Sequence, residues 1–332
     1  AATESLQRRG SSPARTMLSV HDARRAARAG EVAALERPAL WRRAARRAVR
    51  LRPGRYGERL RAAREGACPP SVAKQIEKDL HRTFGSVHVR GVRVPQAEAL
   101  SSLRNVLLAY ASHNPRVGYC QSMNFVAAVL LLVVDEETAF ACLATVVERV
   151  LQGHFADDMA MSLVDGSVLR GLLSAKDPQL MRHLEEMQVA PSLVTAQWLL
   201  TCFVASAMPL SALLRVWDCL FLEGDAALPF LLRLCAALFL SRRDELLAAH
   251  DPGEVYLLLM QSGASVGSAV PLLAAAYALP WDAPLLPHAL AQLRTSHAAT
   301  LVADGAPEAL VLAAQAAAEG AGDAAALEEA EE

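Results

Sequence analysis

The chain has 332 residues, enough for one large domain or two smaller ones. Hydrophobic residues make up 53% of it and charged residues 20%, which excludes a disordered chain, and the formal net charge of −2 argues against a nucleic-acid-binding protein. Because Ala, Leu and Arg are abundant and are strong helix formers, the composition favours an all-α fold.

The N-terminal part opens with a polar lead, residues 1–20, followed by a stretch rich in Arg and Ala that continues to residue 66. Cys68-Pro69-Pro70 then breaks the pattern. We expect a helix to begin directly after this break, with Ser71 as its N-cap, because a serine hydroxyl can accept a hydrogen bond from a free N–H of the first turn.

Apolar spacing indicates the remaining helices. Residues 97–113 follow the i, i+3, i+4 rhythm of an amphipathic helix that ends at the Asn114-Pro115 turn. A second helix is expected from near Tyr119 to Val134. Helical spacing recurs at 136–152, 177–187, 191–206, 210–222, 227–240 and 252–261. Convincing strand alternation is missing, so the sequence predicts an irregular all-α array of many short-to-medium helices.

Two features bear on the compartment. The six cysteines form no C-x-x-C pair and have no zinc-ligand spacing with histidine, so we expect them to be reduced and buried in a cytosolic protein without a metal site. The uncharged stretch Val255–Trp281 is long enough to span a membrane. A Gly- and Ser-rich run and Pro271 interrupt it, so we interpret it as two buried helices with a connector.

The first candidate cluster is Ile76-Glu-Lys-Asp79-Leu-His-Arg82. On a helix Ile76 and Asp79 share one face, and Arg82 lies three residues beyond Asp79. A carboxylate at that spacing can hold a guanidinium in one pose. Taken alone, the spacing is more typical of an ordinary surface ion pair, worth about a few tenths of a kcal/mol.

The second candidate cluster, Tyr119-Cys120-Gln121-Ser122, follows the Asn114-Pro115 turn and opens the most apolar helix of the chain. A glutamine at the mouth of a buried helix is oddly placed for a purely structural residue. Its amide group is nevertheless able to cap a neighbouring helix, so the position of Gln121 alone leaves both interpretations open.

Aromatic residues accompany charges in two further segments, Arg37-Pro-Ala-Leu-Trp41 and Arg215-Val-Trp217-Asp218-Cys-Leu-Phe221-Leu-Glu223-Gly224. The aromatic side chains are most simply core residues. Asp218 stands in an apolar run, so it requires a buried partner.

In this order and spacing, the clusters resemble the TBC domain of Rab GTPase-activating proteins. The family's motifs R-x-x-x-W, I-x-x-D-x-x-R and Y-x-Q are matched by Arg37/Trp41, Ile76/Asp79/Arg82 and Tyr119/Gln121. Its R-[VI]-W-D-x-[FL]-F-x-E-G and W-x-x-x-x-F elements are matched by Arg215–Gly224 and by Trp198 with Phe203. The resemblance covers residues 30–260, and it rests on all motifs together because each one alone is weak.

The sequence departs from the family pattern at three places. Glu31-Val32-Ala33 stands where the family usually has Gly-Ile-Pro, and Gly85 stands where Pro usually follows the second motif. Ser122 stands where Gly usually follows the glutamine, which adds a hydroxymethyl group near the site. None of these departures removes a catalytic side chain.

The resemblance implies a V-shaped pair of helical subdomains, with an N-terminal catalytic part at residues 21–175, a C-terminal part at 176–316 and an Ala/Glu-rich tail at 317–332. It implies a GTPase-activating protein that accelerates GTP hydrolysis in trans and has no substrate chemistry of its own. Arg82 would be an arginine finger that stabilises phosphate charge, and Gln121 a glutamine finger that positions the attacking water.

Supporting roles are implied for the other motif residues. Asp79 would orient Arg82 or tie its helix to the neighbouring loop, with Ile76 on the same motif. Arg37 and Trp41 would brace the N-terminal part, and Tyr119 would combine packing with contact to the partner's switch region.

The expected partner is a Rab-family small GTPase in its GTP form, within vesicle trafficking. The chain is expected to need no cofactor of its own, because the partner carries GTP and Mg²⁺, and to bind no nucleic acid. We expect a monomer in the cytoplasm, and peripheral attachment to endomembranes is left open.

Three alternatives stay open. The chain could be a catalytically weak Rab-binding scaffold or effector. It could be a hydrolase with Cys120 or Ser122 as nucleophile and His113 as base, although no segment resembles an oxyanion-hole loop. The arginines of residues 21–66 could bind acidic lipid, against the simpler interpretation of solvated helix faces in an Arg-rich protein.

Overall fold

The computed structural model describes residues 18–86, 96–155, 160–279 and 287–303, together with residues 311, 314 and 315. All regular structure in these ranges is helical, which confirms the predicted all-α fold. The predicted tail at 317–332, and all but the last three residues of the predicted lead, lie outside the described residues.

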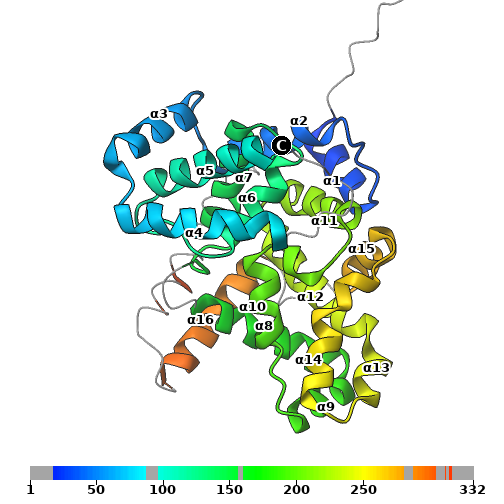
Figure 1. Cartoon of the computed structure of the whole chain (residues 1–332). Coiled ribbons are helices and arrows are strands. Elements are labelled where there is room, and N and C mark those ends of the chain that lie inside the picture. The colour runs from blue at the N-terminus through cyan, green and yellow to red at the C-terminus, as the bar shows by residue number, and fades with distance from the viewer. Residues whose placement is uncertain are drawn as a thin grey trace, which may run out of the picture.

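The helices of the first half of the chain lie in the upper part of the molecule in Figure 1, beside α11 (Leu210–Leu222). They are α1 (Val20–Arg28), α2 (Arg37–Val49), α3 (Arg55–Ala62), α4 (Pro70–Ser86), α5 (Gln96–His113), α6 (Met123–Leu131) and α7 (Glu136–Thr145). Because α5 packs against α3, α4, α6 and α7, it is the central helix of this part. Short π-helical turns, Ala63–Ala67 and Val146–Val150, extend α3 and α7.

The second half of the chain continues as helices. They are α8 (Ala160–Lys176), α9 (Pro178–Glu186), α10 (Ser192–Leu200), α11 (Leu210–Leu222), α12 (Ala227–Ser241), α13 (Arg243–Ala248), α14 (Pro252–Met260), α15 (Ala269–Ala278) and α16 (Pro287–Ala303). Helix α8 packs against α9, α10, α12 and α16, which all follow it in the chain. The subdomain boundary at residue 175 stays a prediction.

Helix α12 is the most deeply buried helix. The segment Gly224–Ser241 is long and apolar enough, by length and composition, to cross a membrane. Every residue from Ala227 to Phe239 is buried, however, and the helix packs against α8, α11 and α15. Its apolar character is therefore that of a core helix.

Two predicted helix starts differ from the structure. Helix α4 begins at Pro70 instead of Ser71, because a proline fits the first turn, where its missing N–H needs no partner. Helix α6 begins at Met123, four residues later than Tyr119. The backbone of Ser122 has φ 106°, which a right-handed helix cannot accommodate, so the preceding residues form a loop.

The apolar stretch after residue 252 forms two helices, α14 and α15, joined by the 3-10 turn Ser262–Ser265, as predicted. Burial is less complete than predicted. Val255 and Leu259 face the core, whereas the side chain of Leu257 is 57% exposed. Each helix therefore covers the core with one face only.

Helix α11 joins the two parts of the molecule through buried charges. Asp218 accepts hydrogen bonds from Arg37 Nε (2.7 Å), Arg37 Nη2 (2.8 Å) and Trp41 Nε1 (3.0 Å), all from α2. Glu223, just after α11, accepts from Arg28 of α1 and from the hydroxyl of Tyr277 on α15. Asp218 thus has the buried partner that its position in the sequence requires.

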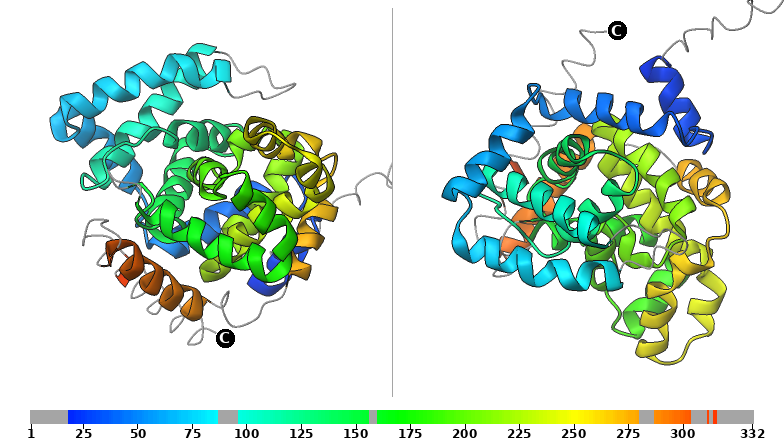
Figure 2. Two further views of the ribbon diagram at one scale, coloured as in Figure 1. Left: turned by 90° about the horizontal axis from the view of Figure 1, so that it is seen from below. Right: turned by 45° about the horizontal axis from the view of Figure 1, so that its top comes forward.

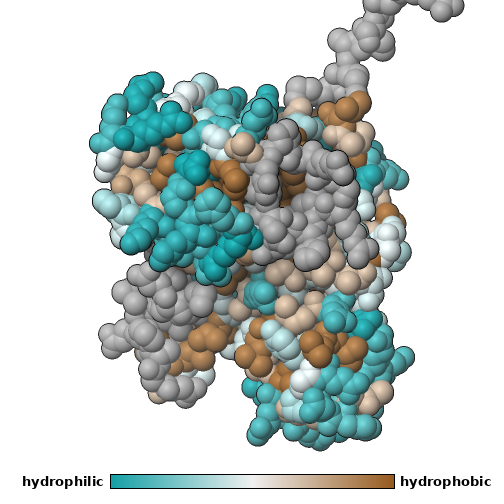
Figure 3. Space-filling view, viewed as in Figure 1, coloured by the Kyte–Doolittle hydropathy of each residue, from teal (hydrophilic) through white to brown (hydrophobic). Residues whose placement is uncertain are grey.

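The arginines near the N-terminus hold helices together. Arg42 bonds to Asp135 and Arg46 to Glu137, so α2 is fastened to the first turn of α7. Hydrophilic residues cover much of the surface over α3 and α4 (Figure 3). These ion pairs give the arginine-rich segment a structural role that requires no lipid.

All six cysteines are free, as predicted, and five of them are buried, whereas Cys120 is partly exposed, contrary to the prediction. The aromatic motif residues are core residues as well. The ring centroids of Trp41 and Phe221 are 4.9 Å apart, and those of Trp198 and Phe203 are 6.1 Å apart.

The segment Glu31-Val32-Ala33, which departs from the family pattern, is held against α11, because Val32 is fully buried and its carbonyl accepts a hydrogen bond from Arg215.

Candidate functional site

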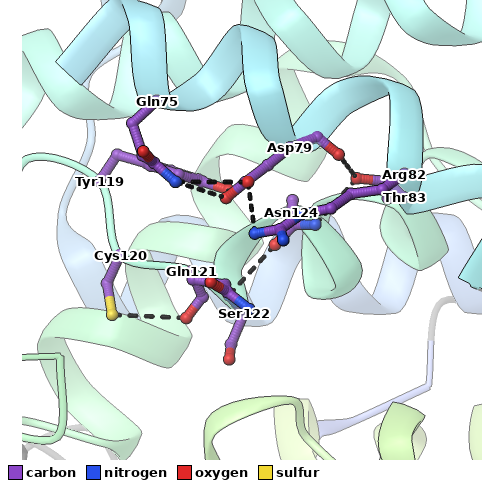
Figure 4. Close-up of polar contacts among 9 residues, drawn as sticks. All are labelled: Gln75, Asp79, Arg82, Thr83, Tyr119, Cys120, Gln121, Ser122 and Asn124. Carbon is purple, nitrogen blue, oxygen red and sulfur yellow. Dashed lines mark hydrogen bonds and ion pairs between the residues drawn. The ribbon is translucent and has the colours of Figure 1, made fainter. Parts of the chain in front are cut away.

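Helix α4 and the loop before α6 bring the two motif clusters together. Helix α4 presents Asp79 and Arg82 toward the loop, which runs from Gly118 to Ser122 and carries Gln121 (Figure 4). The helix is fixed in place by Ile76, which is fully buried, and it packs against α6. The two predicted finger residues therefore stand on adjacent elements.

Asp79 is the centre of the site. Its side chain is only 1% exposed, yet it meets Arg82 Nη2 at 2.5 Å and accepts a hydrogen bond from the Tyr119 hydroxyl at 2.7 Å. Gln75, one turn earlier on α4, donates to the same carboxylate at 3.3 Å. Asp79 thus contacts Arg82 and ties α4 to the loop that carries Gln121.

The guanidinium group of Arg82 is held by Asp79 and is also accessible to solvent. Its side chain is 51% exposed, while its partner carboxylate is buried. A guanidinium group has five N–H donors, so the contact through Nη2 leaves donors free to approach an anion. A cation in this setting is oriented before a ligand arrives.

Tyr119 stays neutral and acts as a donor. Burial raises the pKa of its phenol, and the hydrogen bond to the negatively charged Asp79 raises that pKa further. Because the hydroxyl keeps its proton at physiological pH, it acts as the donor to Asp79 and holds the loop against α4.

The loop around Gln121 has an unusual backbone. Gln121 is exposed, and its carbonyl accepts a contact from the Cys120 thiol at 3.4 Å. The next residue, Ser122, has φ 106° and ψ −33°, a conformation that suits glycine far better than serine. Ser122 occupies the position where glycine is usual in the TBC pattern. The positive φ of this position explains why glycine is preferred there.

Two residues of this site were not singled out from the sequence. Asn124 Nδ2 donates to Thr83 Oγ1 at 2.8 Å, and Asn124 Oδ1 accepts from the Ser122 N–H at 3.1 Å. Both Thr83 and Asn124 are fully buried. The sequence does contain a signal for Asn124, because an amide side chain within the very apolar helix α6 requires buried hydrogen-bond partners.

Arg37 and Trp41 lie outside this site, in a different cluster between α2 and α11, where both contact Asp218.

His113, the base in the alternative hydrolase interpretation, has its Nε2 atom 3.5 Å from a carboxylate oxygen of Glu148, and its ring packs edge-on against Phe140. Across the described ranges, no group of three or more His, Cys, Asp or Glu side chains is placed to hold a metal ion.

Comparison with known proteins identifies the family. The model of the Rab-GTPase-TBC domain matches residues 37–247. TBC1 domain family member 2A of Mus musculus is 40% identical over 227 residues, which cover 67% of this chain and 24% of that protein. Growth hormone-regulated TBC protein 1-A of Danio rerio is 34% identical over 205 residues, 61% of this chain and 55% of that protein. The chain therefore spans about a quarter of the length of TBC1 domain family member 2A.

Solved structures agree. The Chlamydomonas flagellar RabGAP TBC domain has a TM-score of 0.64 at 26% identity and covers 78% of this chain and 82% of its own. The Ypt/Rab-GAP domain of Gyp1p has a TM-score of 0.62 at 17% identity, covering 80% and 94%, which supports the fold alone. Since the family model matches well over half of the sequence, the chain belongs to the Rab-GTPase-TBC domain family.

Proposed function

We propose that this chain is a GTPase-activating protein for Rab-type GTPases in their GTP form. In this proposal it acts in trans, with Arg82 stabilising phosphate charge and Gln121 positioning the attacking water. The observation that carries the proposal is the pairing of a half-exposed arginine with an exposed glutamine on a loop held by the same buried carboxylate, Asp79.

The arginine supplies the larger energy. An arginine finger accelerates hydrolysis on the order of 10³–10⁵-fold, which corresponds to roughly 4–7 kcal/mol of transition-state stabilisation. Guanidinium suits this task because it is always charged and its donors form a planar fork that matches phosphate oxygens. Asp79 supports the assignment by restricting Arg82 beforehand, so less entropy is lost when the phosphate is met.

The side chain of Gln121 has the groups needed to position the attacking water molecule. Its amide oxygen accepts a hydrogen bond from the nucleophile and its amide nitrogen donates one, so the group can hold a water molecule in a set direction without a charge. Gln121 is exposed at the end of a loop that is fastened by Tyr119 and Asp79. In this proposal it replaces the glutamine that a GTPase uses for itself.

The remaining parts of the proposal follow from the partner. GTP and Mg²⁺ belong to the GTPase, so the chain needs no cofactor of its own. The site of action is the cytoplasm or the cytoplasmic face of endomembranes, where vesicle traffic depends on Rab proteins, and the active form is a monomer. Arg37 and Trp41 support the site from a distance by fixing α2 to α11.

The test is catalytic turnover. GTP-loaded Rabs in large excess are mixed with a small amount of this chain, and phosphate release is followed for each Rab. The proposal expects many turnovers per molecule on at least one Rab. Binding of a GTP-loaded Rab without turnover on any member of a full panel would favour the scaffold alternative.

The glutamine role has its own test. Gln121→Ala is compared with Gln197→Ala, a matched change of an exposed glutamine on α10. Only the first is expected to abolish acceleration. Wild-type protein should also accelerate a Rab variant that lacks its own catalytic glutamine, and failure on that variant with activity on normal Rab would contradict the assignment of Gln121.

A further inference from the structure

A buried hydrogen-bonded bridge connects the backbone beside Arg82 to the backbone beside Gln121. On α4, the hydroxyl of Thr83 donates to the carbonyl of Asp79 at 2.6 Å. The same hydroxyl accepts from Asn124 Nδ2 at 2.8 Å. Asn124 Oδ1 then accepts from the Ser122 N–H at 3.1 Å (Figure 4).

Each end of this bridge stands one residue from a proposed finger. Thr83 follows Arg82, and Ser122 follows Gln121. The bridge therefore fixes the two peptide segments relative to each other, at the points where the two working side chains leave the backbone. Tyr119 and Asp79 make a second link between the same elements, on the other side of Gln121.

The bridge is an unfavourable choice for stability alone. Asn124 is fully buried in α6, where its neighbours Met123, Val126 and Ala127 are buried as well. A polar amide in such a place must have all its main bonds made, or it destabilises the fold. An apolar side chain would fill the position with less risk, so the bridge points to a need for fixed geometry.

The backbone of Ser122 supplies an independent observation. Its φ of 106° is strained for a residue with a side chain, and such strain persists only where surrounding bonds hold it. The bond from the Ser122 N–H to Asn124 is one of those that hold it. Without that bond the loop can relax toward a commoner conformation, and Gln121 would turn with it.

We propose that Asn124 and Thr83 are positioning residues that set the spacing and direction of Gln121 relative to Arg82. The inference rests on the proposed GTPase-activating function. It assigns neither residue a contact with nucleotide. Their effect is on the rate of the chemical step rather than on affinity for the Rab, because misplacement of a catalytic group by about 1 Å costs on the order of 10²-fold.

The first test replaces Thr83 by Val, which keeps the shape and removes the hydroxyl, and by Ser, which keeps the hydroxyl. Thr83→Val is expected to lower kcat about tenfold or more with KM for GTP-loaded Rab within about twofold, and Thr83→Ser to restore most of it. Thr195→Val is the matched control, because Thr195 is also buried and its hydroxyl bonds to the carbonyl four residues earlier, on α10.

A general loss of stability predicts a different pattern. In that case Thr195→Val would lower kcat as much as Thr83→Val does, and the positioning role would be overturned. A second comparison uses the Gln121→Ala background, in which Asn124→Ala should lower the remaining activity by less than about twofold, since Asn124 acts through Gln121. An equal loss in both backgrounds would also overturn the proposal.

Wild-type protein gives a measurement that does not depend on variants folding. The Ser122 amide should exchange its hydrogen slowly for a loop amide, because it is bonded to a buried acceptor. Exchange as fast as that of an unprotected loop amide would contradict the bridge. If Arg82→Ala and Gln121→Ala keep full activity, the proposed function fails; if they lose it while Thr83→Val and Asn124→Ala do not, only the bridge fails.

Discussion

The carboxylate of Asp79 is almost completely buried, and it contacts the side chains of Arg82, Tyr119 and Gln75. Such a carboxylate needs all of these donors, because an unpaired buried charge is costly. The consequence is local rigidity at the base of an exposed cation. Spacing within I-x-x-D-x-x-R predicts the Asp79–Arg82 pair, whereas the burial of Asp79 depends on α6 and the loop packed against α4.

Ser122 allows a prediction about backbone strain. A non-glycine residue in its conformation costs of order 1–3 kcal/mol, and glycine removes that cost while adding some freedom to the unfolded chain. Ser122→Gly should therefore raise the free energy of unfolding by about 1 kcal/mol in denaturant titration. Cys120→Gly, two residues earlier in the same loop, is the control and should not stabilise; an unchanged or lowered stability for Ser122→Gly would refute the strain.

At the scale of elements, α11 is the strut that holds α1, α2 and α15. The sequence indicates its helix and its apolar character, and it indicates that Asp218 needs a partner. It does not indicate that Arg37 is that partner, because the two residues lie far apart in the chain and meet only after α2 packs on α11.

Asp218→Ala tests this strut. It leaves the Arg37 guanidinium buried without its carboxylate, and breaking a buried pair in this way costs about 3–5 kcal/mol. Glu185→Ala, which removes an exposed partner of Arg170, should cost about 1 kcal/mol or less. Equal unfolding free energies for the two variants would show that the α2–α11 pair is not a strut.

Helix α9 gives a prediction for pH. The Leu180 N–H, which Asp177 caps, and Arg243 lower the pKa of the Asp177 carboxyl. A depressed folded-state pKa means that the stabilisation is complete above the unfolded value, about 3.9, and is lost as the pH falls through and below it. The stability difference between wild type and Asp177→Asn should thus be constant from pH 7 to about pH 5 and shrink toward pH 3. A difference that grows on acidification would contradict this sign.

Some helices escape prediction for a physical reason. Helix α8 contains Gly166, which lowers helix propensity in the sequence. In the fold that glycine lets α8 approach α10, since a Cβ there would lie 2.5 Å from the Cβ of Ser192. Local sequence reports the cost of the glycine, and only the packed structure reports its benefit.

At the scale of the whole molecule, α16 extends the fold beyond the region matched to the family, residues 37–247. It lies at the edge of the molecule and packs against α8 (Figure 2). Asp165 of α8 is fully buried between Arg294 of α16 (2.8 Å) and His154 (2.7 Å). Burial raises the pKa of the Asp165 carboxyl, but Arg294 and His154 outweigh it, so the net pKa is lowered and the carboxylate stays charged.

Arg294→Met therefore removes a countercharge from a dry site. We expect a loss of roughly 3 kcal/mol or more in unfolding free energy, while GTPase activation per folded molecule is unchanged, because the proposed fingers are on α4 and the α6 loop. Denaturant titration and turnover measure the two effects. A loss of activity in fully folded Arg294→Met would mean that α16 takes part in the site.

Part of the candidate site is predictable from the sequence, and part of it depends on how the helices pack. Arg82, Asp79, Tyr119 and Gln121 are predictable because their spacings form recurring short motifs. Thr83 and Asn124 are not, because their bond joins residues 41 positions apart and depends on how α4 meets α6. Ser122 is a departure in the sequence whose meaning, a strained φ, appears only in three dimensions.

The central claim is that Arg82 is the finger of a GTPase-activating protein. The most direct measurement is the single-turnover rate of GTP hydrolysis on a responsive Rab with wild type, Arg82→Ala and the matched Arg170→Ala, another exposed, ion-paired arginine. The account predicts a loss on the order of 10³-fold or more for Arg82→Ala, in a protein that still folds, and none for Arg170→Ala. Acceleration by Arg82→Ala equal to wild type would contradict it.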